Sequence, residues 1–296
     1  MKRSTQSPLL ILSDTNSASG IYQDVRREEA DWEFLNFQAR RLKKGEHWTH
    51  DTGDNEYAIV LLSGNFTVES SKGAWKTENG RKDVFSGIAH TLYLSRHTKF
   101  TLTANSEVLD IGVGWCETDE DHPPYFKRPE ECAIELRGGD NANRQINSLL
   151  QPGFDCHRLV VVEVYTPSGN WSSFPAHKHD ERILDEDGNV LEARLEEIYF
   201  YKIDKPQGYA IQQVYTGDRS LDEMVRPKND DLVLVPKGYH PVVAGHGYNV
   251  YYLNFLTGSD QSLANTDDPD HKWIYGTWKG QDPRLPLVTA DMNQSS

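Results

Sequence analysis

Short apolar and aromatic runs, separated by closely spaced turn residues, are the feature of this sequence that most restricts its fold. Runs at residues 57–62, 159–165 and 197–203 are rich in Val, Ile, Tyr, Phe and Leu, and Gly, Pro or Asp-Gly turns follow at short intervals. This pattern is typical of an all-β sandwich or barrel. No long stretch repeats its apolar residues every 3.6 positions, so we expect helix only in short pieces, at residues 24–33 and in the C-terminal region.

The strand-like runs fall into two groups, at residues 34–115 and 157–256. A length of 296 residues also suits two domains. We therefore expect an N-terminal barrel within residues 1–136 and a C-terminal barrel within residues 137–296. The stretch 115–150, rich in Pro, Gly and acidic residues, is expected to connect them. A weak internal echo of the segment 177–201 around His47-Trp-Thr-His50 and Glu56 favours a duplication.

The net charge and the cysteine content indicate which partners the protein can bind and in which cellular compartment it works. A formal net charge of −14 argues against nucleic acid or an anionic membrane as the main partner, but a small anion needs only one or two local cations. Three cysteines without a C-x-x-C pair do not make a disulfide framework, so we expect a cytoplasmic protein. The apolar patch at residues 8–12 is too short for a signal peptide or a membrane span.

Three motifs in the C-terminal half offer metal-ligating side chains. Side chains two residues apart in a strand share a face, so His177 and His179 point the same way. Glu197 begins an aromatic run, and His240 follows the turn Pro236-Lys-Gly238. Three neutral imidazoles and one carboxylate suit one divalent ion, and we expect Zn²⁺ or Mn²⁺, with Fe²⁺ or Ni²⁺ as alternatives. The competing interpretation is that these histidines cap strands and hydrogen-bond to the backbone.

Other side chains near these motifs are candidates for binding substrate or moving a proton. They are Tyr199 and Tyr201 on the face of Glu197, Gln212, Lys237 beside His240, and Asn254. Lys178 and Arg182 are further candidate cations for an anionic substrate, although strand alternation turns Lys178 outward.

Two sets of charged or imidazole residues are expected to do no chemistry. Glu196 should face away from Glu197, as a solvated or interdomain carboxylate, and Asp222 and Glu223 are expected in a loop. His47 and His50 are three residues apart, so a strand puts them on opposite faces, and no P-x-G-x-H motif accompanies them. We therefore expect no metal in the N-terminal barrel, whose role would be to cover the second barrel.

The C-terminal motifs resemble the two motifs of the cupin superfamily, matched by His177, His179 and Glu197 and by Pro236, Gly238 and His240, with Asn254 downstream. Longer stretches closely resemble the 5-deoxy-glucuronate isomerases of inositol catabolism. They include Pro175-Ala-His-Lys-His-Asp-Glu181, Val233-Leu-Val-Pro-Lys-Gly-Tyr-His-Pro241 and Arg137-Gly-Gly-Asp-Asn-Ala-Asn-Arg-Gln-Ile-Asn147. The chain departs from this family at Gln213 and Arg219, where Arg and Gly are expected, and the 18-residue step from His179 to Glu197 is long for a cupin.

The resemblance implies a bicupin, with two all-β cupin barrels (a double-stranded β-helix or jelly roll) in one chain. It also implies a metal-dependent aldose–ketose isomerase that converts 5-deoxy-D-glucuronate, a small anionic sugar acid, to 5-dehydro-2-deoxy-D-gluconate. A homo-oligomer is compatible with it. The alternatives are a 5-keto-4-deoxyuronate isomerase of pectin breakdown, an iron-dependent cupin oxygenase, and a non-catalytic bicupin that binds sugars.

Overall fold

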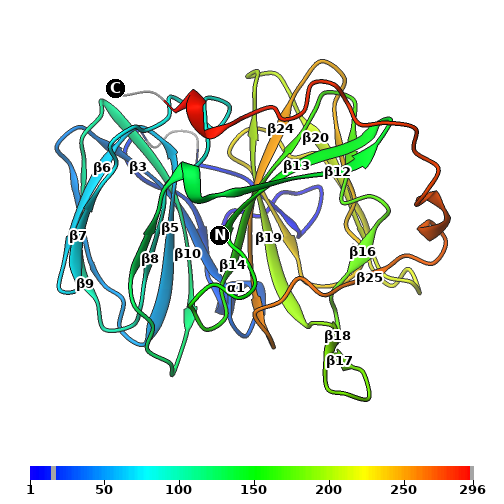
Figure 1. Cartoon of the computed structure of the whole chain (residues 1–296), viewed down its shortest axis with the longest axis horizontal. Helices are drawn as coiled ribbons and strands as arrows, with labels where there is room; N and C mark the ends of the chain where they lie inside the picture. The colour runs from blue at the N-terminus through cyan, green and yellow to red at the C-terminus, as the bar shows by residue number, and fades with distance from the viewer. Residues whose placement is uncertain (15–17, 294–296) are drawn as a thin grey trace.

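The computed structural model describes residues 1–14 and 18–293, and its regular structure consists mainly of strands arranged in two barrels (Figure 1). The expectation of an all-β fold is confirmed. The helices of the described part are one α-helical turn, α1 (Arg27–Ala30), and three 3-10 turns. Those at Lys272–Ile274 and Ala290–Met292 lie, like α1, where short helical pieces were expected, whereas the turn at Pro129–Glu131 was not predicted. None of these helices is long and apolar enough to cross a membrane.

The first barrel consists of two antiparallel sheets that enclose a core including Ile59, Leu102 and Ile111. Its six-stranded sheet has the order β11 (Tyr125–Lys127), β8 (Thr91–Leu94), β5 (Asn55–Ser63), β10 (Val108–Glu117), β3 (Asn36–Lys43) and β2 (Gly20–Val25). Its four-stranded sheet has the order β4 (His47–Asp51), β9 (Lys99–Ala104), β6 (Phe66–Ser70) and β7 (Gly73–Lys76).

The second barrel repeats this plan with a seven-stranded sheet, whose members are β1 (Leu10–Ile11), β22 (Leu232–Val235), β19 (Leu195–Ile203), β24 (Val250–Gly258), β14 (Val160–Thr166), β13 (Ala142–Leu150) and β12 (Ala133–Gly139). Opposite it lie β15 (Trp171–Ser172), β23 (Val242–Ala244), β20 (Ala210–Tyr215) and β21 (Asp222–Val225). Two short pairs are also present: β16 (His177–Lys178) with β25 (Thr266–Asp267), and β17 (Ile183–Leu184) with β18 (Val190–Glu192), which form a hairpin that projects from the barrel (Figure 1).

The stretch 115–150 is more than the expected connection, because it supplies β11 to the first barrel and β12 and β13 to the second. Its polar composition is misleading, since Asn143, Gln145 and Asn147 are fully buried. Their amide groups are hydrogen-bonded inside the protein, for example Asn143 to Asn170 and Asn147 to Glu163. Buried amides with partners are compatible with an interior strand.

Each end of the chain lies against the other end's barrel. Near the N-terminus, β1 pairs with β22 of the second barrel, with Leu10 opposite Val233. The C-terminal segment runs back over the second barrel to the first (Figure 1), where the Asn293 side chain hydrogen-bonds to the backbone of Ile88. The barrels also share one apolar core, in which Phe37 of β3 contacts Phe200 of β19 and Phe255 of β24.

Two carboxylates join the barrels in matching ways. Glu56 in β5 accepts hydrogen bonds from the backbone N–H groups of residues 157–159, directly before β14. Glu196 in β19 accepts hydrogen bonds from the N–H groups of residues 33–35, directly before β3. The expected interdomain role of Glu196 is confirmed, and the two contacts relate the barrels by an approximate twofold symmetry in which β5 corresponds to β19.

The contact between β10 and β24 depends on the absence of side chains at two positions of β10. A Cβ atom on Gly114 would lie 2.2 Å from the Phe255 ring, and one on Gly112 would lie 2.8 Å from Leu253. Both contacts are shorter than real Cβ contacts allow, and the ring of Phe255 is fully buried in the shared core. Glycine is therefore required where the two sheets cross.

We expect Gly114→Ala to lower the free energy of unfolding by about 1–3 kcal/mol, the usual cost of overpacking a core. The measurement is urea denaturation followed by circular dichroism. Gly217→Ala is the matched control, because nothing lies within 4 Å of a Cβ atom there. Equal urea midpoints for the two variants would contradict this account of the barrel contact.

Candidate metal centre

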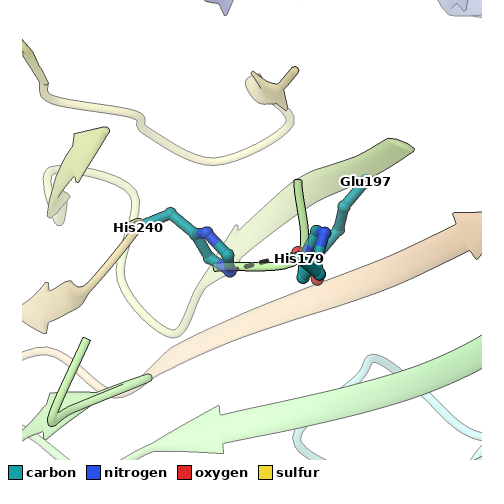
Figure 2. A group of neighbouring side chains, drawn as sticks. All are labelled: His179, Glu197 and His240. Atoms are coloured by element: carbon teal, nitrogen blue, oxygen red, sulfur yellow. Dashed lines mark hydrogen bonds and ion pairs between the residues drawn. The ribbon is translucent and has the colours of Figure 1, made fainter. Parts of the chain in front are cut away.

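Three side chains from separate stretches of the second barrel converge at one point (Figure 2). His179 follows β16, Glu197 lies in β19, and His240 lies between β22 and β23. Their ligand atoms all lie within 4.8 Å of one another. Glu197 Oε2 is 2.9 Å from His179 Nε2 and 3.3 Å from His240 Nε2. An imidazole nitrogen and a carboxylate oxygen at such a separation share either a proton or a cation.

Backbone carbonyl groups fix both imidazole rings from behind. His179 Nδ1 donates a hydrogen bond to Leu195 O at 3.1 Å, and His240 Nδ1 donates to Gly238 O at 2.8 Å. A carbonyl oxygen only accepts, so each Nδ1 carries a proton and each Nε2 faces the centre, where a metal ion would replace any proton shared with Glu197. Such outer contacts are typical of histidines that bind metals.

The turn before His240 ties two of the motifs together. Gly238 adopts a φ of +90°, and a Cβ atom on it would lie 2.4 Å from the carbonyl oxygen of Tyr215. Its N–H group donates a 2.6 Å hydrogen bond to the Asp180 carboxylate, next to His179. Glycine at this position thus lets the P-x-G-x-H turn pack against the end of β20, while its N–H group links the turn to the H-x-H segment.

His177 lies beside the group of three. Its ring centroid is 4.8 Å from that of His240 and 6.4 Å from that of His179. The side chain is half-buried and lines the cavity that leads to the centre. It is therefore close enough to approach an ion held by the other three, although its nitrogen atoms do not belong to the tight group.

The chemistry of the donor set fits a divalent cation. His240 Nε2 is buried and has no hydrogen-bond partner in the described residues, which is costly unless something else occupies that lone pair. Burial lowers the pKa of His240 to about 4, and burial together with the charge of His240 lowers the pKa of His177 well below its usual value. Burial opposes protonation of His179, but its hydrogen bond to Glu197 raises its pKa. Neutral imidazoles next to a carboxylate are the ligands that Zn²⁺ or Mn²⁺ accepts.

Two adjoining cavities open beside this centre. Some of the residues that the sequence suggested for substrate binding line these cavities, and others do not. Tyr199 and Asn254 line one cavity with His179 and Glu197, and the Asn254 amide donates to Ile198 O. Tyr201 and Gln212 lie outside both linings, fully buried, with the Tyr201 hydroxyl donating to Gln212 Oε1 at 2.8 Å.

The lysine and acid candidates lie elsewhere. Lys237 is exposed and lines a different hollow, with Asp180 and Glu196, because it projects outward from the tight turn. Lys178 is half-buried and donates to the buried Glu192, and Arg182 is paired with Asp260. The expected loop at Asp222 and Glu223 is wrong: these residues begin β21, which pairs with β20. The Asp222 carboxylate accepts hydrogen bonds from the side chains of Gln213 and Arg219, the two positions that depart from the family.

The cations at the cavities are two arginines that the sequence analysis did not select. Arg137 and Arg144 line both cavities, together with His177. They lie directly opposite each other on the hairpin of β12 and β13. A signal existed in the sequence, since Gly-Gly-Asp-Asn between strand-like runs predicts a tight turn that would place Arg137 across from Arg144.

The equivalent point of the first barrel is built differently. Glu197 lies opposite Leu256 and Val235, and Tyr57 lies at the same place in its sheet, opposite Trp115 and Leu94. The Tyr57 hydroxyl is 2.8 Å from His50 Nε2, just as the Glu197 carboxylate contacts His179. The rings of Trp48 and Phe100 pack around His50. Aromatic side chains thus fill the space that imidazoles and a carboxylate surround in the second barrel.

Comparison with known proteins identifies the family. The model of the KduI/IolB family matches residues 9–274. A 5-deoxy-glucuronate isomerase of Geobacillus thermodenitrificans is 37% identical over 269 residues, which are 90% of this chain and 96% of that protein. The 5-deoxy-glucuronate isomerase of Bacillus subtilis is 35% identical over 257 residues, 86% of this chain and 92% of that protein.

Comparison with solved structures supports the same family. The crystal structure of an IolB-like protein from Salmonella typhimurium is 36% identical, has a TM-score of 0.85, and is matched over 90% of this chain and 99% of that chain. A variant of Bacillus subtilis oxalate decarboxylase is only 13% identical, with a TM-score of 0.61 over 90% of this chain and 81% of that chain, and shares the fold alone. The expected bicupin fold is confirmed, and the chain belongs to the KduI/IolB family.

Proposed function

We propose that this protein is a divalent-metal-dependent aldose–ketose isomerase that converts 5-deoxy-D-glucuronate to 5-dehydro-2-deoxy-D-gluconate in the catabolism of myo-inositol. The observation that carries the proposal is the 37% identity to a 5-deoxy-glucuronate isomerase over nearly the whole of both chains. The convergence of His179, Glu197 and His240 at a cavity supports it independently.

We propose His177, His179, Glu197 and His240 as the metal ligands, and place the active site in the second barrel, residues 137–296. The first barrel, residues 1–136, is proposed to hold no metal, because Tyr57 and Trp48 surround His50 where ligands would be needed. A divalent ion held by this set, Zn²⁺ or Mn²⁺ in our proposal, supplies a Lewis acid that polarises a carbonyl and the neighbouring hydroxyl group.

The reaction conserves every atom: the aldehyde becomes a hydroxymethyl group, and the adjacent alcohol becomes a ketone. Tyr199 is proposed to hydrogen-bond the sugar as a neutral donor, because burial and the charge of Glu197 raise its pKa well above the usual value. Asn254, held by Ile198 O, is proposed as a second polar contact on the cavity wall. Tyr201 and Gln212 support this wall from behind. Free thiols at Cys116, Cys132 and Cys156 support a cytoplasmic location.

We expect the protein to hold one divalent ion per chain, measured by inductively coupled plasma mass spectrometry after dialysis. His240→Gln should weaken binding at least about 100-fold, because even outer partners of ligands typically contribute about 10- to 100-fold. His246→Gln is the matched control, since His246 is exposed and belongs to the same barrel. Metal content that is the same in both variants would refute the proposed ligand set.

Incubation with 5-deoxy-D-glucuronate in deuterated water, followed by NMR, tests the activity itself. We expect the ketose product at equal mass, loss of turnover after chelation, and recovery with one divalent ion. Deuterium at the new hydroxymethyl carbon would indicate proton transfer, and its absence a hydride shift. Preferred turnover of 5-keto-4-deoxyuronate, oxygen consumption, or full activity of the metal-free protein would each contradict the proposal.

A further inference from the structure

The arrangement of Arg137 and Arg144 is unfavourable unless an anion accompanies it. The two residues are direct partners in the antiparallel pairing of β12 and β13, so their side chains lie on the same face of the hairpin. Like charges directly opposite each other destabilise a sheet. Both side chains line the cavities that also contain His177.

The carboxylates near these arginines do not neutralise Arg144. The Arg137 guanidinium donates two hydrogen bonds to the Glu135 carboxylate, of 2.6 and 2.8 Å. Asp267, which lines one of the cavities, accepts a hydrogen bond from the Tyr275 hydroxyl at 3.1 Å. The Arg144 guanidinium makes no hydrogen bond or ion pair within residues 1–14 and 18–293, and its Nε atom is buried without a partner. A half-buried guanidinium that lacks a partner has an unused fork of donors, which matches the geometry of a carboxylate.

The other cationic side chains that the sequence analysis selected either form ion pairs with carboxylates or lie outside the two cavities. Lys178 is bound to Glu192 and Arg182 to Asp260. Lys237 lines a hollow that does not contain the proposed metal ligands. Arg144, by contrast, lines both the cavity with His179 and Glu197 and the adjoining one, so it belongs to the wall of the space that a substrate at this centre would occupy.

We propose that Arg144 binds the carboxylate of the substrate and so selects sugar acids over neutral sugars, an inference that rests on the proposed isomerase function. Arg137, held by Glu135, contributes to the positive charge of the same wall. The position of the carboxylate then fixes which end of the sugar meets His179, Glu197 and His240. Arg144 is a binding and specificity residue, and it takes no part in moving the proton or hydride.

The test measures turnover of 5-deoxy-D-glucuronate and of 5-deoxy-D-glucose, in which a hydroxymethyl group replaces the carboxylate. Arg144→Gln should lower kcat/KM for the acid roughly 100-fold, mainly through KM, because a charged hydrogen-bond partner is lost. It should leave kcat/KM for the neutral sugar unchanged. Arg144→Lys should restore part of the loss, and Arg182→Gln, which removes an exposed arginine outside the cavities, should match the wild type.

Calorimetric titration with D-gluconate and D-glucitol separates this inference from the proposed function, because neither probe carries an aldehyde. We expect the wild type to bind gluconate more tightly than glucitol, and Arg144→Gln to lose that preference while keeping the wild-type melting temperature. An Arg144-dependent preference for gluconate without turnover of the uronate would sustain the carboxylate site and reject the isomerase. Gluconate binding that is equal in the two proteins, or absent from both, or an equal loss of kcat/KM for both sugars, would overturn the role of Arg144.

Discussion

The alternation of side chains along β19 positions both the candidate site and the joint between the barrels. Glu197 points to the interior of the second barrel, where it contacts His179 and His240. Its neighbour Glu196 points the opposite way and accepts hydrogen bonds from three backbone N–H groups of the first barrel. A shift of one residue in the register of β19 would exchange these two carboxylates and abolish both arrangements at once. The packing between the barrels therefore also holds β19, the strand that carries the candidate metal ligand Glu197.

The convergence of the candidate metal-ligand motifs was predictable because each motif is a local pattern. The H-x-H pair and the P-x-G-x-H turn depend on strand alternation and on one glycine, and both are visible within a few residues of sequence. Glu197 could be assigned to the set because it begins an aromatic strand, and Glu196 to the other face for the same reason. The exposed position of Lys237 was not predicted, since nearness in sequence to His240 says nothing about which way a turn projects its middle residue.

The arginines and the buried amides were missed because long-range pairing determines their surroundings. Arg144 reaches the candidate site through the pairing of β13 with β12 and β14, whereas the candidate ligands come from other segments of the barrel. Asn143, Gln145 and Asn147 looked like linker residues, yet partners more than ten residues away satisfy their amide groups. Composition alone does not separate a solvated polar stretch from an interior polar network.

The duplicated barrel shows how one architecture supports different interiors. Tyr57 and Glu197 occupy matching places in the two sheets, and the first is surrounded by aromatic rings while the second meets imidazoles. The oxalate decarboxylase comparison makes the same point at low identity, since a shared fold does not fix the reaction. Function must therefore be argued from the side chains of the candidate site and not from the fold.

Anomalous-difference diffraction from metal-loaded crystals, recorded at the absorption edge of the bound ion, tests the central claim most directly. The account predicts one peak per chain, about 2.0–2.2 Å from His179 Nε2, His240 Nε2 and a Glu197 oxygen. A peak at the exposed group of Asp119, Glu120 and His157 instead, or no peak beside Glu197, would contradict it.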